Sequence, residues 1–214
     1  MARVVVPGCP HLITQWGRGG RDIFLSTADR RRFLKLLAGY SKRKGLKVRA
    51  YALLPNRVSV VAVPRDRLSL AFALKLALRS YAKYVKKKGL RRGRVWKSRF
   101  ASCPIDPQYC REAMRHVERG PVRAGLVSRA EQYRWSSAAA HCGNRKDPVP
   151  SGGAVKNWAA WLSEAGDPKF AKLLERHTRT GRPLGSKEFI RDLERRFRRR
   201  FRCRKPGPPR KKRT

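Results

Sequence analysis

The chain has 214 residues, of which 41% are hydrophobic, so it is long enough for one folded core with an extension. Lys and Arg number 54 against 14 Asp and Glu, which gives a formal net charge of +40. This excess predicts a polyanionic partner, because binding a nucleic acid releases the counterions condensed on it. The sequence has no apolar run long enough to cross a bilayer, and its N-terminus lacks the apolar segment of a signal peptide. We therefore expect a cytoplasmic protein with no membrane partner.

The cysteines are odd in number, scattered along the chain and never spaced as Cys-x-x-Cys. This pattern favours reduced thiols over a disulfide framework or a zinc site. The residues are Cys9, Cys103, Cys110, Cys142 and Cys203.

The first β-prone run covers residues 4–16 and predicts a strand. A loop rich in glycine and arginine follows at residues 17–21. In this loop Arg18 and Arg21, together with backbone amides, are candidates for phosphate contacts. A flexible connection from strand to helix is the alternative interpretation.

Residues 26–45 then predict a helix, because Ser26 and Asp29 form a capping-box pattern and Gly45 is a stop signal. Two strands are predicted at residues 46–54 and 57–63, joined by the turn signal Pro-Asn. Side chains alternate along a strand, so Arg57 and Ser59 share one face of the second of these strands.

A second helix is predicted from Ser69 to Gly89, with its last lysines placed to complement the helix dipole. The order strand, helix, strand, strand, helix, strand predicts an α+β fold of the ferredoxin-like split βαβ type, with an antiparallel sheet. A sheet face of this kind often serves as a nucleic-acid platform.

Cations alternate with aromatic residues over residues 91–100, a pattern suited to following a nucleic-acid backbone and stacking on bases. The candidate contacts in this segment are Arg94, Trp96, Lys97 and Arg99. The alternative is that Trp96 and Phe100 simply pack in the core.

A third helix is predicted from Asp106, an N-cap followed by proline, to about Val117. One stripe of this helix carries Tyr109, Glu112 and His116, and residue 120 would continue it.

Beyond the core, residues 144–153 read as a linker rich in proline and glycine, and residues 154–203 as a basic helical extension. We expect helices near residues 158–162, 167–177 and 186–201. Residues 204–214 are predicted to form a disordered basic tail that binds phosphates. Its candidate contacts are Arg204, Lys205, Arg210 and Lys211.

With these parts in place, the chain resembles the REP-associated tyrosine transposases, bacterial relatives of the single-tyrosine HUH transposases. The resemblance covers nearly the whole chain. The matching segments are residues 18–19 (Arg-Gly), 22–25 (Asp-Ile-Phe-Leu), 29–34 (Asp-Arg-Arg-Arg-Phe-Leu), 51–56 (Tyr-Ala-Leu-Leu-Pro-Asn), 98–100 (Ser-Arg-Phe), 121–127 (Pro-Val-Arg-Ala-Gly-Leu-Val), 133–137 (Tyr-Arg-Trp-Ser-Ser) and 180–186 (Thr-Gly-Arg-Pro-Leu-Gly-Ser).

The resemblance implies an HUH core at residues 1–143 that cuts and rejoins single-stranded DNA beside imperfect palindromic hairpins. It implies a tyrosine nucleophile and a divalent metal such as Mg²⁺, held by two histidines one residue apart and an amide side chain. It also implies a bacterial, nucleoid-associated protein. Related insertion-sequence transposases work as dimers, so the resemblance is compatible with a homodimer.

This sequence departs from the family at each catalytic position. Arg57 and Ser59 replace the two histidines, His116 stands at the tyrosine position, and Gly120 replaces the asparagine. Arg has no lone pair for a metal, and its charge would repel a divalent ion about 4 Å away by roughly 8 kcal/mol. We therefore expect no metal cofactor and no intact catalytic residue.

The leading hypothesis is a protein that binds single-stranded or hairpin DNA without cleaving it, with Arg57 and Arg123 among the nucleic-acid contacts. A working transposase that uses His116, or a displaced Tyr109, is one alternative. An RNA- or ribosome-binding protein is the other, because RNA is an equally good partner for so much positive charge.

Overall fold

The computed structural model describes residues 3–89, 93–147, 149 and 155–201. Its centre is an antiparallel sheet of four strands in the order β2-β3-β1-β4. The strands are β1 (His11–Trp16), β2 (Leu46–Leu54), β3 (Arg57–Pro64) and β4 (Ala101–Pro104). This order, with one helix after β1 and another after β3, confirms the α+β fold of the ferredoxin-like type.

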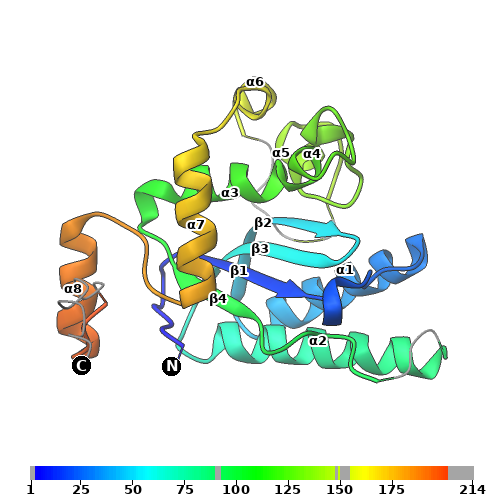
Figure 1. Cartoon of the computed structure of the whole chain (residues 1–214), viewed down its shortest axis with the longest axis horizontal. Helices are drawn as coiled ribbons and strands as arrows, with labels where there is room; N and C mark the ends of the chain where they lie inside the picture. Colours follow the sequence, from blue (N-terminus) through cyan, green and yellow to red (C-terminus); the bar gives the residue numbers. More distant parts are fainter. Residues whose placement is uncertain (1–2, 90–92, 148, 150–154, 202–214) are drawn as a thin grey trace, which may run out of the picture.

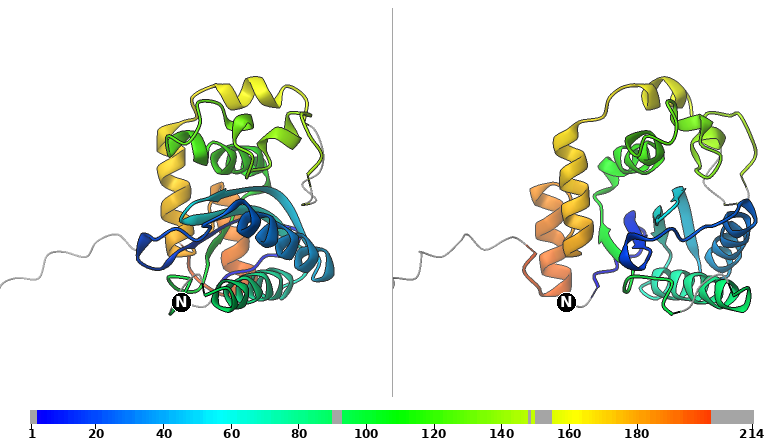
Figure 2. Two further views of the ribbon diagram at one scale, coloured as in Figure 1. Left: turned by 90° about the vertical axis from the view of Figure 1, so that its right-hand side faces the viewer. Right: turned by 45° about the vertical axis from the view of Figure 1, so that its right-hand side comes forward.

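Helices cover both faces of the sheet (Figures 1 and 2). On one face lie α1 (Thr27–Arg43) and α2 (Ser69–Lys87), and on the other lie α3 (Cys110–Glu118) and α7 (Pro168–Thr180). The remaining helices are α4 (Gly120–Arg123), α5 (Ala138–His141), α6 (Trp158–Ser163) and α8 (Lys187–Phe197), with 3-10 turns η1 (Arg18–Gly20), η2 (Pro107–Tyr109) and η3 (Ala130–Gln132). No helix in the described ranges is long and apolar enough to span a membrane.

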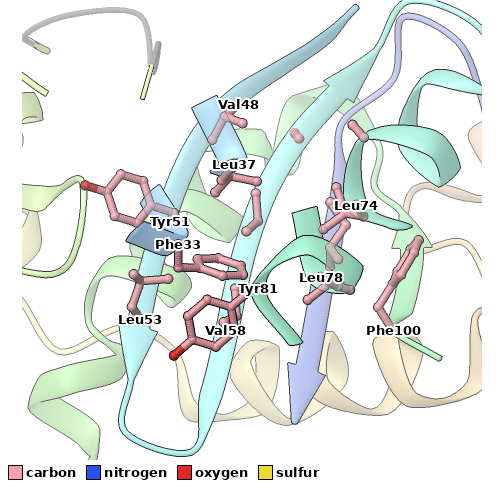
Figure 3. Close-up of a cluster of buried hydrophobic side chains, with 14 of the residues drawn as sticks. Phe33, Leu37, Val48, Tyr51, Leu53, Val58, Leu74, Leu78, Tyr81 and Phe100 are labelled. Atoms are coloured by element: carbon pink, nitrogen blue, oxygen red, sulfur yellow. The ribbon is translucent and has the colours of Figure 1, made fainter. Parts of the chain in front are cut away.

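The main hydrophobic core lies between the sheet and the α1–α2 pair. Val58 and Val60 of β3 belong to it, together with Phe33 of α1 and Tyr81 of α2. Figure 3 shows Val58, Phe33 and Tyr81 in this cluster. The Phe33 and Tyr81 rings lie edge to face, 5.4 Å apart. Alternation along β3 then places Arg57 and Ser59 on the opposite face, as the sequence predicts.

The helix ends follow the local sequence signals. Asp29 donates its backbone N–H to Ser26 Oγ at 3.2 Å, and its carboxylate accepts the Ser26 N–H at 3.0 Å, so the predicted capping box forms. At the other end of α1, Gly45 takes a positive φ of 64°. The predicted start of α7 is confirmed as well, since Asp167 accepts the backbone N–H of Lys169.

The expected strand at residues 4–16 is wrong in its first half, because β1 begins only at His11. Val4 and Val6 are buried, but they pack against Leu193 of α8 and Phe201 instead of joining the sheet. A run of valines is compatible with a strand and with an irregular buried segment. Which of the two forms here depends on the position of α8. The predicted last helix is also shorter than expected, ending at Phe197 before a left-handed Arg198.

The predicted third helix forms with close to the expected end, but its first turn is 3-10. Asp106 caps η2, α3 follows to Glu118, and the short α4 begins after Arg119. His11 of β1 is fully buried. Its Nδ1–H donates to the Cys9 carbonyl at 2.8 Å, and its Nε2 accepts the Val6 N–H at 3.2 Å. This neutral form is consistent with burial lowering the pKa of His11 to about 4.

The C-terminal extension packs directly on the core. Leu174 of α7 and Trp158 of α6 share one hydrophobic cluster with Leu12 of β1. The predicted linker is partly anchored too, because the Tyr51 hydroxyl donates to both carboxylate oxygens of Asp147, at 2.9 and 3.2 Å. Residues 148 and 150–154, and the predicted tail at 204–214, lie outside the described residues.

Both edges of the sheet are partly covered. Along β2, Leu53 donates to the Trp135 carbonyl at 2.8 Å, and Ser137 donates to the Tyr51 carbonyl at 3.0 Å. Along β4, Leu184 donates to the Pro104 carbonyl at 2.9 Å. The Tyr-Arg-Trp-Ser-Ser segment therefore has a structural role as the cover of β2.

Candidate nucleic-acid site

A cavity of about 330 Å³ lies between the face of the sheet, α3, α4 and α7. It brings together the positions that the sequence singled out, although they come from separate segments. Its wall includes Arg57 and Ser59 of β3, His116 of α3, Gly120 and Arg123 of α4, and Glu175 of α7. We call this space the sheet cavity.

Arg57 is held in the sheet cavity without full hydrogen bonding. Its Nε is buried and has no hydrogen-bond partner. Burial lowers the pKa of Arg57, and the negative charge of Glu175 partly offsets this effect. A half-buried guanidinium whose Nε–H has no partner can donate to an anionic acceptor.

Arg123 and His116 form a second polar pair in the same cavity. Arg123 donates to the His116 carbonyl at 2.7 Å, and its guanidinium also lies 3.4 Å from His116 Nε2. Because Arg can only donate, Nε2 is the lone-pair nitrogen and Nδ1 carries the proton. Burial, followed by the charges of Arg123 and Arg57, lowers the pKa of His116 to about 3, so the imidazole is neutral at pH 7.

The charges around the sheet cavity are mostly positive. Burial, followed by the nearby Arg57, lowers the pKa of Arg123 to about 10, while Glu175 opposes the shift. The α7 side adds Lys172, Arg176 and Arg179. The cavity is therefore suited to an anion.

The residues present do not fit a divalent metal. Among the described residues, no cluster of three His, Cys, Asp or Glu side chains is arranged to hold a metal ion. Arg57 supplies no lone pair, and Gly120 supplies no side chain at the positions the family would use for ligands. Of the described cysteines, Cys9, Cys103, Cys110 and Cys142 are free thiols, as expected.

The Leu-Pro-Asn turn between β2 and β3 holds the arginine-rich loop in place. The Asn56 carbonyl accepts the Gly17 N–H at 2.9 Å, and the side-chain Nδ2 of Asn56 donates to the Gly20 carbonyl at 3.3 Å. Arg18 and Arg21 are left exposed on this anchored loop. The loop is therefore fixed at several points rather than merely a flexible connection.

The loop lies beside the basic segment that follows α2. Arg18 donates its N–H to the Val95 carbonyl at 3.0 Å, and Lys97 donates to the Trp16 carbonyl at 3.0 Å. Trp16 lines the sheet cavity, so both segments approach it at this residue, although their exposed cations are not among the residues that line it. We call this set the basic rim: Arg18, Arg21, Arg94 and Lys97.

Trp96 and Phe100 pack in the core, which was the alternative to the predicted base stacking. The Trp96 ring lies 5.8 Å from Tyr81, and its Nε1 donates to the Leu78 carbonyl at 3.0 Å. Phe100 is buried beneath Arg3, whose guanidinium lies 3.7 Å from the ring centre. Arg99 is exposed and lines a different hollow, with Arg3.

Tyr109, the displaced nucleophile candidate, does not line the sheet cavity. It packs against Phe170 of α7, with ring centres 5.5 Å apart, and faces an adjoining hollow. The four predicted contacts of the tail, Arg204, Lys205, Arg210 and Lys211, lie outside the described residues.

Sequence reasoning missed the contribution of α7 and the role of Glu118. The stripe Lys172, Arg176 and Arg179 has helical spacing, which was the available signal for α7. Glu118 is fully buried and accepts from Trp158 Nε1 at 2.7 Å, His141 Nδ1 at 2.5 Å and Ser137 Oγ at 2.5 Å. These bonds tie the end of α3 to α5 and α6 and so fix the helix that carries His116.

Comparison with protein-family models finds no match, and comparison with curated proteins finds none either. Among solved structures, the chain is similar to a REP-associated tyrosine transposase bound to a REP hairpin, with a TM-score of 0.56 and 15% sequence identity. The match covers 73% of this chain and 96% of that one. At this identity the similarity establishes a transposase-like fold.

Proposed function

We propose that the protein binds single-stranded or hairpin DNA through its transposase-like fold and does not cleave it. The observation that carries the proposal is Arg57, a half-buried residue with a buried, unpartnered Nε in the wall of a cationic cavity. A phosphodiester provides the oxygen acceptors that this group lacks. The neighbour of similar fold is described as bound to a REP hairpin, which supports the same class of partner here.

Arg57 and Arg123 would grip one phosphate, while the basic rim would follow the backbone leading into the sheet cavity. Phosphate contacts of this kind position a strand without reading its sequence. Each neutralised phosphate releases counterions, so binding should weaken steeply as salt rises.

The absence of cleavage follows from the chemistry of the cavity. Metal-assisted activation of a phosphodiester needs lone-pair donors, and Arg57 and Gly120 offer none. Attack by His116 would require its Nε2 lone pair, which faces Arg123 at 3.4 Å. Tyr109 faces the adjoining hollow instead of the sheet cavity.

The test combines a binding and a cleavage assay on the whole chain. Fluorescence anisotropy with a labelled DNA hairpin carrying a single-stranded flank should show binding, with an RNA hairpin of the same sequence binding more weakly. Incubation of the DNA with Mg²⁺ or Mn²⁺, followed by a denaturing gel, should show no covalent adduct. An adduct would establish a working transposase, and preferential binding of the RNA would establish an RNA-binding protein.

A further inference from the structure

A second hollow, of about 670 Å³, adjoins the sheet cavity on the far side of His116. It lies between α3, the start of α7 and the segment that joins α6 to α7. The two spaces share His116, Arg123, Lys172 and Glu175. Its volume falls within the range of about 300–1,000 Å³ that is usual for small-ligand pockets.

The walls of this second hollow combine aromatic rings with unpartnered polar groups. Tyr109 and Phe170 form one wall, and Trp161 contributes to another. Aromatic walls of this kind stack on a flat heterocycle.

Two polar atoms of α3 border the hollow without hydrogen-bond partners. Glu112 Oε2 and His116 Nδ1 are both buried and unpaired. Glu112 and His116 are four residues apart, so they lie one above the other on the same helix face. Because Arg123 occupies the Nε2 side of His116, Nδ1 presents a hydrogen to the ligand, while the carboxylate of Glu112 presents an acceptor.

Two arginines of the same helix are partly engaged by α6. Arg115 and Arg119 each donate to the Glu164 carbonyl at 2.6 Å, and Arg119 also donates to the Leu162 carbonyl. These bonds fasten the end of α6 to α3. Arg115 Nε is also buried without a partner, so this wall offers N–H donors from Arg115 and His116 and an acceptor from the Glu112 carboxylate.

We propose that this hollow holds one unstacked guanine base of a bound single strand, with its phosphate at Arg57 and Arg123 in the sheet cavity. The edge of guanine carries two adjacent donors, N1–H and the 2-amino group, which suit the carboxylate of Glu112. Its O6 acceptor suits the Nδ1–H of His116. Adenine and cytosine each offer only the exocyclic amine as a donor on this edge, so they make fewer of these bonds.

This inference rests on the proposed function, so the test separates the two. Equilibrium binding is measured for dT12 and for oligonucleotides of the same length with one central deoxyguanosine, deoxyinosine or deoxyadenosine. Phosphate binding predicts that all four bind. The guanine pocket predicts that the guanosine oligonucleotide binds about tenfold more tightly than the inosine one, which lacks the 2-amino group.

The variant Glu112→Gln keeps the shape of the side chain and should bring the ratio of the guanosine and inosine affinities close to one. The control Glu188→Gln removes the same charge from the exposed first turn of α8 and should leave the ratio unchanged. Because a ratio is compared, the general gain in affinity from removing a negative charge cancels. Melting temperatures check that each variant is folded.

Equal affinities for the guanosine, inosine and adenosine oligonucleotides would overturn the pocket and leave the phosphate site standing. A ratio that persists in Glu112→Gln would overturn the role of that carboxylate. If none of the four oligonucleotides binds, the proposed function and the pocket both fail.

Discussion

The two faces of the sheet differ in the kind of side chain that they present. On the α1–α2 face, Val58 and Val60 belong to an apolar core in which Phe33 and Tyr81 lie edge to face. On the α3–α7 face, the same strand presents Arg57, a cation whose Nε is buried and unpartnered. The apolar face therefore contributes packing, and the cationic face is the one suited to an anionic ligand.

The largest effect should come from the stabilising face. Phe33→Ala removes a fully buried ring from the main core, so the free energy of unfolding should fall by about 3–5 kcal/mol. Urea denaturation followed by circular dichroism measures the loss. Phe72→Ala on α2, where the ring is 43% exposed, is the control and should stay within about 0.5 kcal/mol of the parent. Similar losses for both variants would contradict the assignment of the core.

Next in size is the network that positions α3. Glu118→Gln replaces an acceptor for three donors with a group that itself donates, so it should lower the free energy of unfolding by about 1–3 kcal/mol. Proton exchange of the Trp158 indole, followed by NMR, should become faster. An unchanged exchange rate would show that this bond is not maintained in solution.

The ligand-binding face should respond in the opposite way. Arg57→Met removes a phosphate contact, so affinity for single-stranded DNA should drop about tenfold and the salt slope should fall by about 1. Stability should not fall, because the variant removes a half-buried charge whose Nε–H has no partner.

Arg191→Met, on the exposed side of α8, is the matched control for the loss of one charge, and its affinity should change far less. If Arg57→Met destabilises the protein and leaves affinity unchanged, the two faces do not differ as described.

The smallest effect concerns pH. The pKa of His116 is lowered to about 3 in the folded protein, against about 6.5 when unfolded. Its neutral form therefore favours folding above pH 6.5, and this contribution is lost as pH falls toward 3. Between pH 7 and pH 5 the loss should be about 1 kcal/mol after allowance for partial solvent exposure.

Comparison with His116→Asn isolates this contribution, because the buried His11 titrates equally in both proteins. The fall in stability between pH 7 and pH 5 should be smaller in the variant, as measured by urea denaturation at each pH. An identical fall in the two proteins would place His116 in contact with solvent.

The features that could be predicted from the sequence are those fixed by local geometry. Alternation along a strand placed Arg57 and Ser59 on one face, and helical spacing placed Glu112 and His116 on one stripe. These rules depend only on neighbouring residues, so they hold before the tertiary structure is known.

The features that could not be predicted depend on which distant segments meet. The valines at positions 4 and 6 match a strand pattern, yet they pack against α8 and do not join the sheet. Nothing within α7 says that Glu175 will border the sheet cavity, because that depends on where the helix docks. Trp96 sits among cations in the sequence, yet its ring belongs to the core.

The partly covered edges of the sheet limit how this protein can assemble. Trp135 and Ser137 are bonded along residues 51–53 of β2, and Leu184 is bonded to Pro104 of β4, so these parts of the two borders are already paired. The paired parts leave less of each border for another polypeptide that docks by adding a strand. For any association between copies, at +40 a nucleic acid would have to screen their mutual repulsion.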